Sequence, residues 1–123
     1  MWISLFPGAL TTSPPEKRIT IDVDPDYLFG LADDKTRAQA VKLQEPFIGK
    51  WMKLSGPIVD VSNVNGRSFI VLRASHFRLI LAFFDDSWRD QTSTFRLDQK
   101  ISIYCQIQEI GMTDLTLFHC EVL

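Results

Sequence analysis

The sequence predicts a mainly β fold in which five strands close into a small barrel, preceded by a helical extension. From residue 47 onward, short apolar stretches with strand-like alternation are separated by turn residues. Nine Phe and three Trp supply flat rings that pack well between strands. The first apolar stretch, residues 47–61, is long for one strand and contains glycine, which is typical of a strand that bends.

The length of 123 residues predicts a single domain that can bury a core without metal or disulfide support. Residues 1–18 contain a Thr-Thr-Ser-Pro-Pro run, so we expect them to form a flexible tail. The domain is expected over residues 19–123. Within it, residues 19–45 form a strand and helical lead-in, and residues 46–123 form the barrel.

Two helices are expected in the lead-in, after a short strand over residues 19–23. Asp24 and Pro25 suit the N-cap and the first position of the first helix. The second helix is expected over residues 35–44, capped by Asp34 and ended by the proline that follows. The side chains expected to face inward are Tyr27, Leu28, Leu31, Ala38, Val41 and Leu43.

The strands of the barrel follow from the alternation and from the turns between them. Gly56 marks the expected bend in the first strand, and Asn65 and Gly66 favour the positive φ angles of a two-residue hairpin turn. A short helix over residues 88–95, between strands three and four, is expected to plug the barrel. The expected strands are residues 47–61, 68–73, 77–84, 101–108 and 115–122. This order is that of the OB barrel, and a small open α+β sheet is the main alternative.

Positive charge is concentrated on the first three expected strands. The whole chain has a net charge of −2 and a pI near 5.6, which argues against a basic protein that coats DNA. Residues 46–83 nevertheless carry five cations against one carboxylate, a net charge of +4, whereas residues 1–45 carry −2 and residues 84–123 carry −4. The cations therefore lie on the face that OB domains commonly use for oligonucleotides.

Aromatic rings accompany these cations, and base stacking on such rings is worth about 1–3 kcal/mol per base. The candidate nucleic-acid-binding residues are Lys50, Trp51, Lys53, Arg67, Phe69, Arg73, Arg78 and Tyr104. Phe84 is a further candidate ring, although Phe69 and Phe84 also suit a core. We expect a non-enzymatic module that binds single-stranded nucleic acid through strands one to three. The alternative is a module that binds another protein through the same face.

The two cysteines are expected to face each other in the last hairpin. If that hairpin turns around residues 112–113, Cys105 and Cys120 are paired positions, about 4.5–5.5 Å apart at Cα. That distance permits a disulfide, but two buried thiols in a reducing compartment are the favoured interpretation. His119 is adjacent to Cys120 and would point to the opposite face, so it is not expected to activate the thiol.

No catalytic or metal-binding set is visible, so no enzyme activity, cofactor or metal is expected. The spacing of Asp85, Asp86 and Asp90 fits no EF-hand loop, and helix capping explains the first two. The apolar residues 1–6 are too few to span a bilayer, so no transmembrane segment is expected. We expect a cytoplasmic protein, with an upstream signal or anchor left open.

Parts of the chain also resemble a known family. Residues 47–61 look like the first strand of a family of uncharacterised bacterial OB-fold proteins that are similar to tRNA-anticodon-binding domains (tRNA_anti-like). Residues 97–101 and 115–123 resemble the last two strands of that family, and residues 27–31 and 36–44 resemble its helical lead-in. The resemblance implies the OB barrel over residues 19–123 and supplies no catalytic residue.

Overall fold

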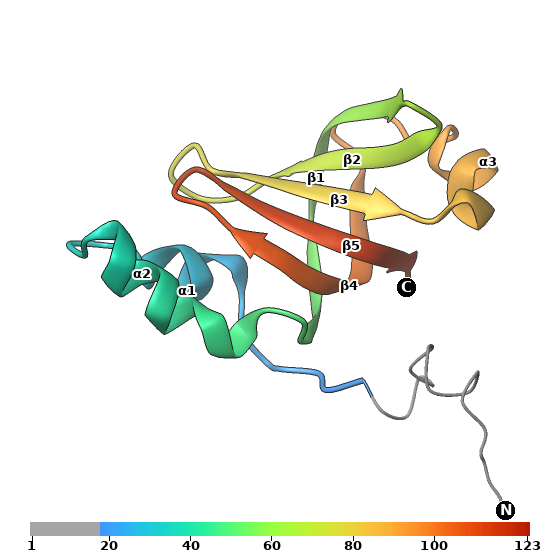
Figure 1. Ribbon diagram of the computed structural model, residues 1–123. Helices are drawn as coiled ribbons and strands as arrows, with labels where there is room; N and C mark the ends of the chain where they lie inside the picture. The colour runs from blue at the N-terminus through green and yellow to red at the C-terminus, as the bar shows by residue number, and fades with distance from the viewer. Residues whose placement is uncertain (1–17) are drawn as a thin grey trace, which may run out of the picture.

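A computed structural model describes residues 18–123 and shows a closed five-stranded barrel (Figure 1). The strands are β1 (Trp51–Val64), β2 (Arg67–Arg73), β3 (Leu79–Phe84), β4 (Lys100–Ile110) and β5 (Asp114–Val122). They are ordered β1-β2-β3-β5-β4, with β3 and β5 parallel and the other neighbours antiparallel. The expected OB-type barrel is confirmed, and the open sheet is excluded because β4 pairs with β1.

The barrel closes because β1 changes partner along its length. β1 pairs with β4 as far as Pro57 and with β2 from Ile58 onward, and a bulge lies between Ile58 and Asp60. The bend predicted at Gly56 therefore lies slightly later in the strand, at the change of partner after Pro57 and the bulge that follows it. Gly56 itself faces the backbone of β2, where an added Cβ would lie 3.5 Å from the Arg73 carbonyl oxygen.

The hairpin between β1 and β2 is the one that the sequence predicts. Asn65 and Gly66 have φ angles of 55° and 77°, as both central residues of a type I′ turn require.

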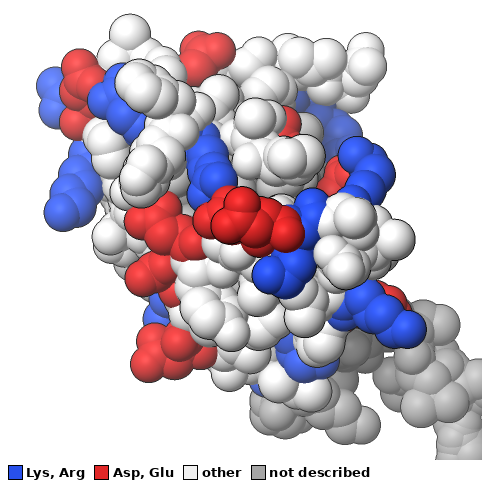
Figure 2. Space-filling model, turned by 90° about the vertical axis from the view of Figure 1, so that its left-hand side faces the viewer, with Lys and Arg blue, Asp and Glu red and all other residues white. Residues whose placement is uncertain are grey.

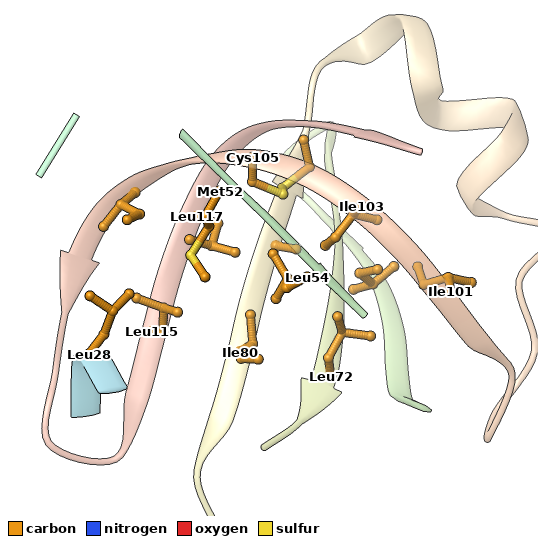
Figure 3. Close-up of a cluster of buried hydrophobic side chains, with 14 of the residues drawn as sticks. Leu28, Met52, Leu54, Leu72, Ile80, Ile101, Ile103, Cys105, Leu115 and Leu117 are labelled. Carbon is orange, nitrogen blue, oxygen red and sulfur yellow. A yellow bond between two sulfur atoms is a disulfide. The ribbon is translucent and has the colours of Figure 1, made fainter. Parts of the chain in front are cut away.

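Side chains of alternating residues fill the barrel, as Figure 3 shows for Met52, Leu54, Ile103 and Leu117. The helices close its two ends. α1 (Pro25–Gly30) supplies the fully buried Leu28 and Phe29 beside the β2–β3 and β4–β5 loops. η4 (Asp86–Trp88) and α3 (Arg89–Thr92) lie at the other end, as expected for the plug between strands three and four. There Trp88 and Phe95 pack against the core.

The lead-in differs from the expectation in its second helix. Asp24 caps α1 as predicted, but the cap of α2 (Arg37–Gln44) is Thr36 rather than Asp34. Thr36 forms a capping box with Gln39, and this reciprocal pair sets where the helix begins. With this start, the side of α2 that faces the core carries Ala40 and Gln44, and both side chains are buried. η3 (Glu45–Phe47) follows α2.

Four side chains of the lead-in that were expected to face inward do not, and one expected strand is not formed. Ala38, Val41 and Leu43 are exposed, Tyr27 is 53% exposed, and the expected strand over residues 19–23 is one isolated bridge from Thr20 to Trp51. Residues 1–17 of the predicted tail lie outside the described residues.

Cys105 and Cys120 form a disulfide inside the barrel, with their Cα atoms 4.2 Å apart. The predicted opposition of the two residues is correct, and the favoured pair of thiols is wrong. Both cysteines are buried, so the bond is shielded from solvent and ties β4 to β5 from within.

We predict that the disulfide contributes substantially to stability. It joins residues 15 apart, and a loop of about 15 residues corresponds to about 3 kcal/mol in the chain-entropy description. The double variant Cys105→Ser, Cys120→Ser should lower the free energy of unfolding by at least that amount, measured by urea denaturation. Reduced wild-type protein is the control and should lose about 3 kcal/mol, whereas the variant should lose somewhat more, because it also buries two serine hydroxyls in the core. An unchanged midpoint in the variant would contradict the prediction.

Candidate nucleic-acid interface

The outer side of β2 is built by strand alternation. Ser68, Ile70 and Leu72 are buried, so the residues between them must point away from the core. The outward residues are Arg67, Phe69, Val71 and Arg73, of which Val71 is covered by its neighbours and only 8% exposed. They place a cation at each end of one strand, with apolar side chains between them.

Two further phenylalanines extend this surface across the neighbouring strands. Phe83 of β3 is paired in register with Phe69, and the ring centroids are 4.9 Å apart. Phe118 of β5 meets Phe83 edge to face at 5.4 Å. All three rings are half-buried, which means that part of each still faces solvent. We call Arg67, Phe69, Phe83 and Phe118 the aromatic face.

The guanidinium of Arg67 lies on this face. Its central carbon is 4.9 Å from the Phe83 ring centroid and 4.7 Å from the Phe118 centroid. Both distances are within the range of cation–π attraction. Within residues 18–123, the Arg67 side chain makes no hydrogen bond or ion pair. The cation is therefore held in place by rings while its N–H groups stay available.

Polar and apolar groups border the aromatic face. His119 follows Phe118, and its Nδ1 lies 3.0 Å from an Asp85 carboxylate oxygen, both groups being exposed. Val71 is paired with Leu81 next to the rings; Val71 is only 8% exposed, so the half-buried Leu81 alone extends the apolar surface along β3. Asp60 is paired with Val71 on the other side, so one carboxylate lies close to the strand that carries the cations.

A second pair of aromatic rings, on β1 and β4, is covered by residues of the lead-in. Trp51 stacks on Tyr104 at 5.1 Å, and the Arg18 guanidinium lies 3.9 Å from the Trp51 centroid. Arg18 also donates to Glu121 at 3.0 Å, and the Tyr104 hydroxyl lies 2.6 Å from that of Thr20. Trp51 is only 7% exposed. These rings fix the start of the lead-in to the barrel and offer little surface to a base.

The eight predicted residues thus separate into groups. Arg67, Phe69 and Arg73 share the outer side of β2, whereas Trp51, Lys53 and Tyr104 belong to β1 and β4. Arg78 is engaged elsewhere: it donates to Asp33 at 3.3 Å and lies over the Phe29 ring at 5.0 Å. Lys50 is half-buried in the turn before β1.

Sequence reasoning missed Phe83 and Phe118 and chose Phe84 instead. Phe84 is 3% exposed and belongs to the core. Because consecutive strand residues face opposite sides, only one of Phe83 and Phe84 can point outward. The alternation of buried Ile80 and Ala82 in β3 identifies Phe83 as that residue.

The end of the molecule that carries α1 and α2 has a different character. Figure 2 shows Lys, Arg, Asp and Glu side chains mixed on this end, without a patch of one sign. A groove of about 260 Å³ lies there between α2 and the β4–β5 hairpin, where apolar residues such as Val41 and Met112 alternate with charged ones such as Lys35 and Glu109. Among the described residues, no helix is long and apolar enough to cross a membrane, and no three potential metal ligands come together.

No protein-family model and no curated protein matches the sequence. Among solved structures, the chain is similar to a candidate nucleic acid-binding lipoprotein from Klebsiella pneumoniae, with a TM-score of 0.61, 19% identity, and coverage of 98% of this chain and 99% of that one. It is also similar to a candidate aspartyl-tRNA synthetase from Leishmania major, with a TM-score of 0.51 and 10% identity over 90% of this chain but 22% of that one.

A third similar structure is an OBody bound to hen egg-white lysozyme, with a TM-score of 0.50, 7% identity, and coverage of 63% of this chain and 85% of that one. At these identities the likenesses establish the OB fold alone.

We predict that Arg18 stabilises the fold. Arg18→Ala removes a cation–π contact and an ion pair that are partly shielded from solvent, so the free energy of unfolding should fall by about 1–2 kcal/mol. Urea denaturation would measure the change. Arg96→Ala is the control, because this exposed side chain makes no bond within residues 18–123 and should stay within about 0.5 kcal/mol of wild type. Equal stability of both variants would contradict the structural role.

Proposed function

We propose that this barrel is a non-enzymatic module that binds short single-stranded nucleic acid across the aromatic face. The observation that carries the proposal is the alignment of three half-buried Phe rings on adjacent strands, with a cation that has no carboxylate partner among the described residues. The outer side of β2 and β3 is also where OB domains commonly bind oligonucleotides.

Stacking supplies the first part of the binding free energy. Every base has a flat π surface, so rings such as Phe69 and Phe83 accept different bases with similar strength, about 1–3 kcal/mol for each. The rings are already held against one another, and this order reduces the entropy that is lost on binding.

Arg67 and Arg73 supply the second part through their positive charge. Both point outward from β2, and the six residue steps between them correspond to about 20 Å. A backbone that follows β2 would therefore meet a cation at both ends of the apolar stretch. Asp60 and the net charge of −2 limit the attraction, so we expect weak binding that falls steeply with salt.

Two further observations support the proposal. The structure similar over nearly the whole length of both chains is described as nucleic acid-binding, and another is described as a tRNA synthetase. The sequence resemblance to the bacterial tRNA_anti-like OB proteins is in line with these likenesses, and we include membership of that family in the proposal.

A protein partner on the same face is the second candidate function. Leu81 of β3 is half-buried and adds aliphatic surface beside the rings, and extended apolar surface is typical of protein interfaces. The OBody bound to lysozyme is an OB structure in complex with a protein. Failure of oligonucleotides to bind, together with a partner lost on Phe69→Ala, would favour this candidate.

We also propose an oxidising compartment in place of the cytoplasmic location expected from the sequence. The buried bond between Cys105 and Cys120 supports this, because structural disulfides form and persist mainly outside reducing compartments. Alkylation of free thiols in extracts of the native cells would test it, since wholly reduced protein would speak against the proposal.

We predict that Phe69→Ala weakens binding to an oligothymidylate of about nine nucleotides. Loss of one stacking ring should raise Kd about 5- to 150-fold, measured by fluorescence titration at low salt. Phe77→Ala is the matched control, because Phe77 is 100% exposed in the β2–β3 loop and lies outside the aromatic face. Equal losses in the two variants, with both folded by circular dichroism, would place the site elsewhere.

We predict that Arg73→Ala lowers the salt dependence of binding. Removal of one phosphate contact should reduce the slope of log K against log salt by about 0.7 in magnitude. Arg37→Ala on α2 removes the same exposed charge away from the aromatic face and should leave the slope unchanged. A slope that changes equally in both variants would indicate long-range attraction without contact at Arg73.

A further inference from the structure

We propose that Arg67 gives the site a preference for guanine. This inference rests on the proposed function and concerns which base the site accepts. Among the arginines of residues 18–123, Arg18, Arg78 and Arg89 have carboxylate partners at 3.0–3.5 Å. Arg67 has none there, and its contacts are the Phe83 and Phe118 rings.

A guanidinium in this position is prepared for planar recognition. The rings hold it at 4.9 and 4.7 Å, so fewer side-chain conformations must be given up when a ligand binds. Its N–H groups project in its own plane and form a rigid fork that matches two adjacent acceptors. The partner that fits best is therefore a flat group with two neighbouring acceptor atoms.

Guanine carries such a pair in O6 and N7, and the bidentate contact with arginine is the commonest specific contact to a base. Adenine offers N7 beside a donor amino group, which opposes an arginine N–H, and thymine has an N3–H between its two carbonyl oxygens, so neither carries such a pair. Cytosine carries N3 and O2 as neighbouring acceptors on its Watson–Crick edge, so the preference is expected against adenine and thymine. The base edge therefore determines whether both N–H groups of the fork are satisfied.

A phosphate has the same acceptor chemistry, and the position of Arg67 favours the base. Phe69 lies two residues along β2 on the same outer side, about 7 Å away. A flat group that meets Arg67 edge to edge therefore lies beside the rings, over apolar surface. A base gains stacking there, whereas a phosphate would lose part of its hydration.

Three oligonucleotides test the inference on the wild-type protein: an oligothymidylate of about nine nucleotides, the same strand with one central guanine, and that strand with 7-deazaguanine, which lacks the N7 acceptor. We expect the guanine strand to bind about 5- to 150-fold more tightly than the other two. Arg67→Lys, which keeps the charge and loses the fork, should abolish this preference, so that the three strands bind the variant with equal affinity.

Arg73→Lys is the matched control, because Arg73 is an exposed arginine on the same strand without rings beneath it, and the preference should persist. Phe118→Leu, which removes one ring under the guanidinium, should reduce the preference in folded protein. Equal affinity of the wild type for all three strands, or equal weakening of all three by Arg67→Lys, would overturn the inference and identify Arg67 as a phosphate contact. If no strand binds, the proposed function fails as well.

Discussion

The pairing of β1 with two different strands is the constraint on which the rest of the structure depends. Its first half lies against β4 and its second half against β2, so the sheet has no long free edge. Closure also gives every strand one side in the core and one side outside. The positions of Arg67, Phe69 and Phe83 on the outside follow from that division, because the residues between them are committed to the core.

The last two strands depend on a second local feature, a bulge at His119. Leu115 and Leu117 face inward, so a regular strand would bring residue 119 into the core and turn Cys120 outward. Instead β5 has an extra residue there, and His119 adopts a φ of 57°. The reversal turns Cys120 inward, so the disulfide relies on it, whereas Phe118 precedes the bulge and lies outside in either case.

The sequence predicts the features that depend on neighbouring residues better than those that depend on distant ones. Alternation and the Asn65–Gly66 turn predict the barrel and its first hairpin, because they act within a few residues. The position of Cys120 opposite Cys105 was predicted although two compensating bulges intervene. The aromatic face was only half predicted. Phe83 joins Phe69 through the antiparallel pairing of β2 with β3, and the alternation within β3 could have identified it. Phe118 joins them through the parallel pairing of β3 with β5, which no local pattern encodes. The cover of Arg18 over Trp51 likewise joins residues far apart in the chain.

Three arginines of the described chain lie on aromatic rings, and their partners separate structural roles from binding. Arg18 and Arg78 each also have a carboxylate, which balances their charge and uses their donors to hold the lead-in against the barrel. Arg67 has the rings alone, so its charge and its donors remain for a ligand. Residue type and local charge cannot distinguish these cases, because all three are arginines in a mildly acidic chain. The distinction arises only when the barrel closes and determines which arginine meets a carboxylate.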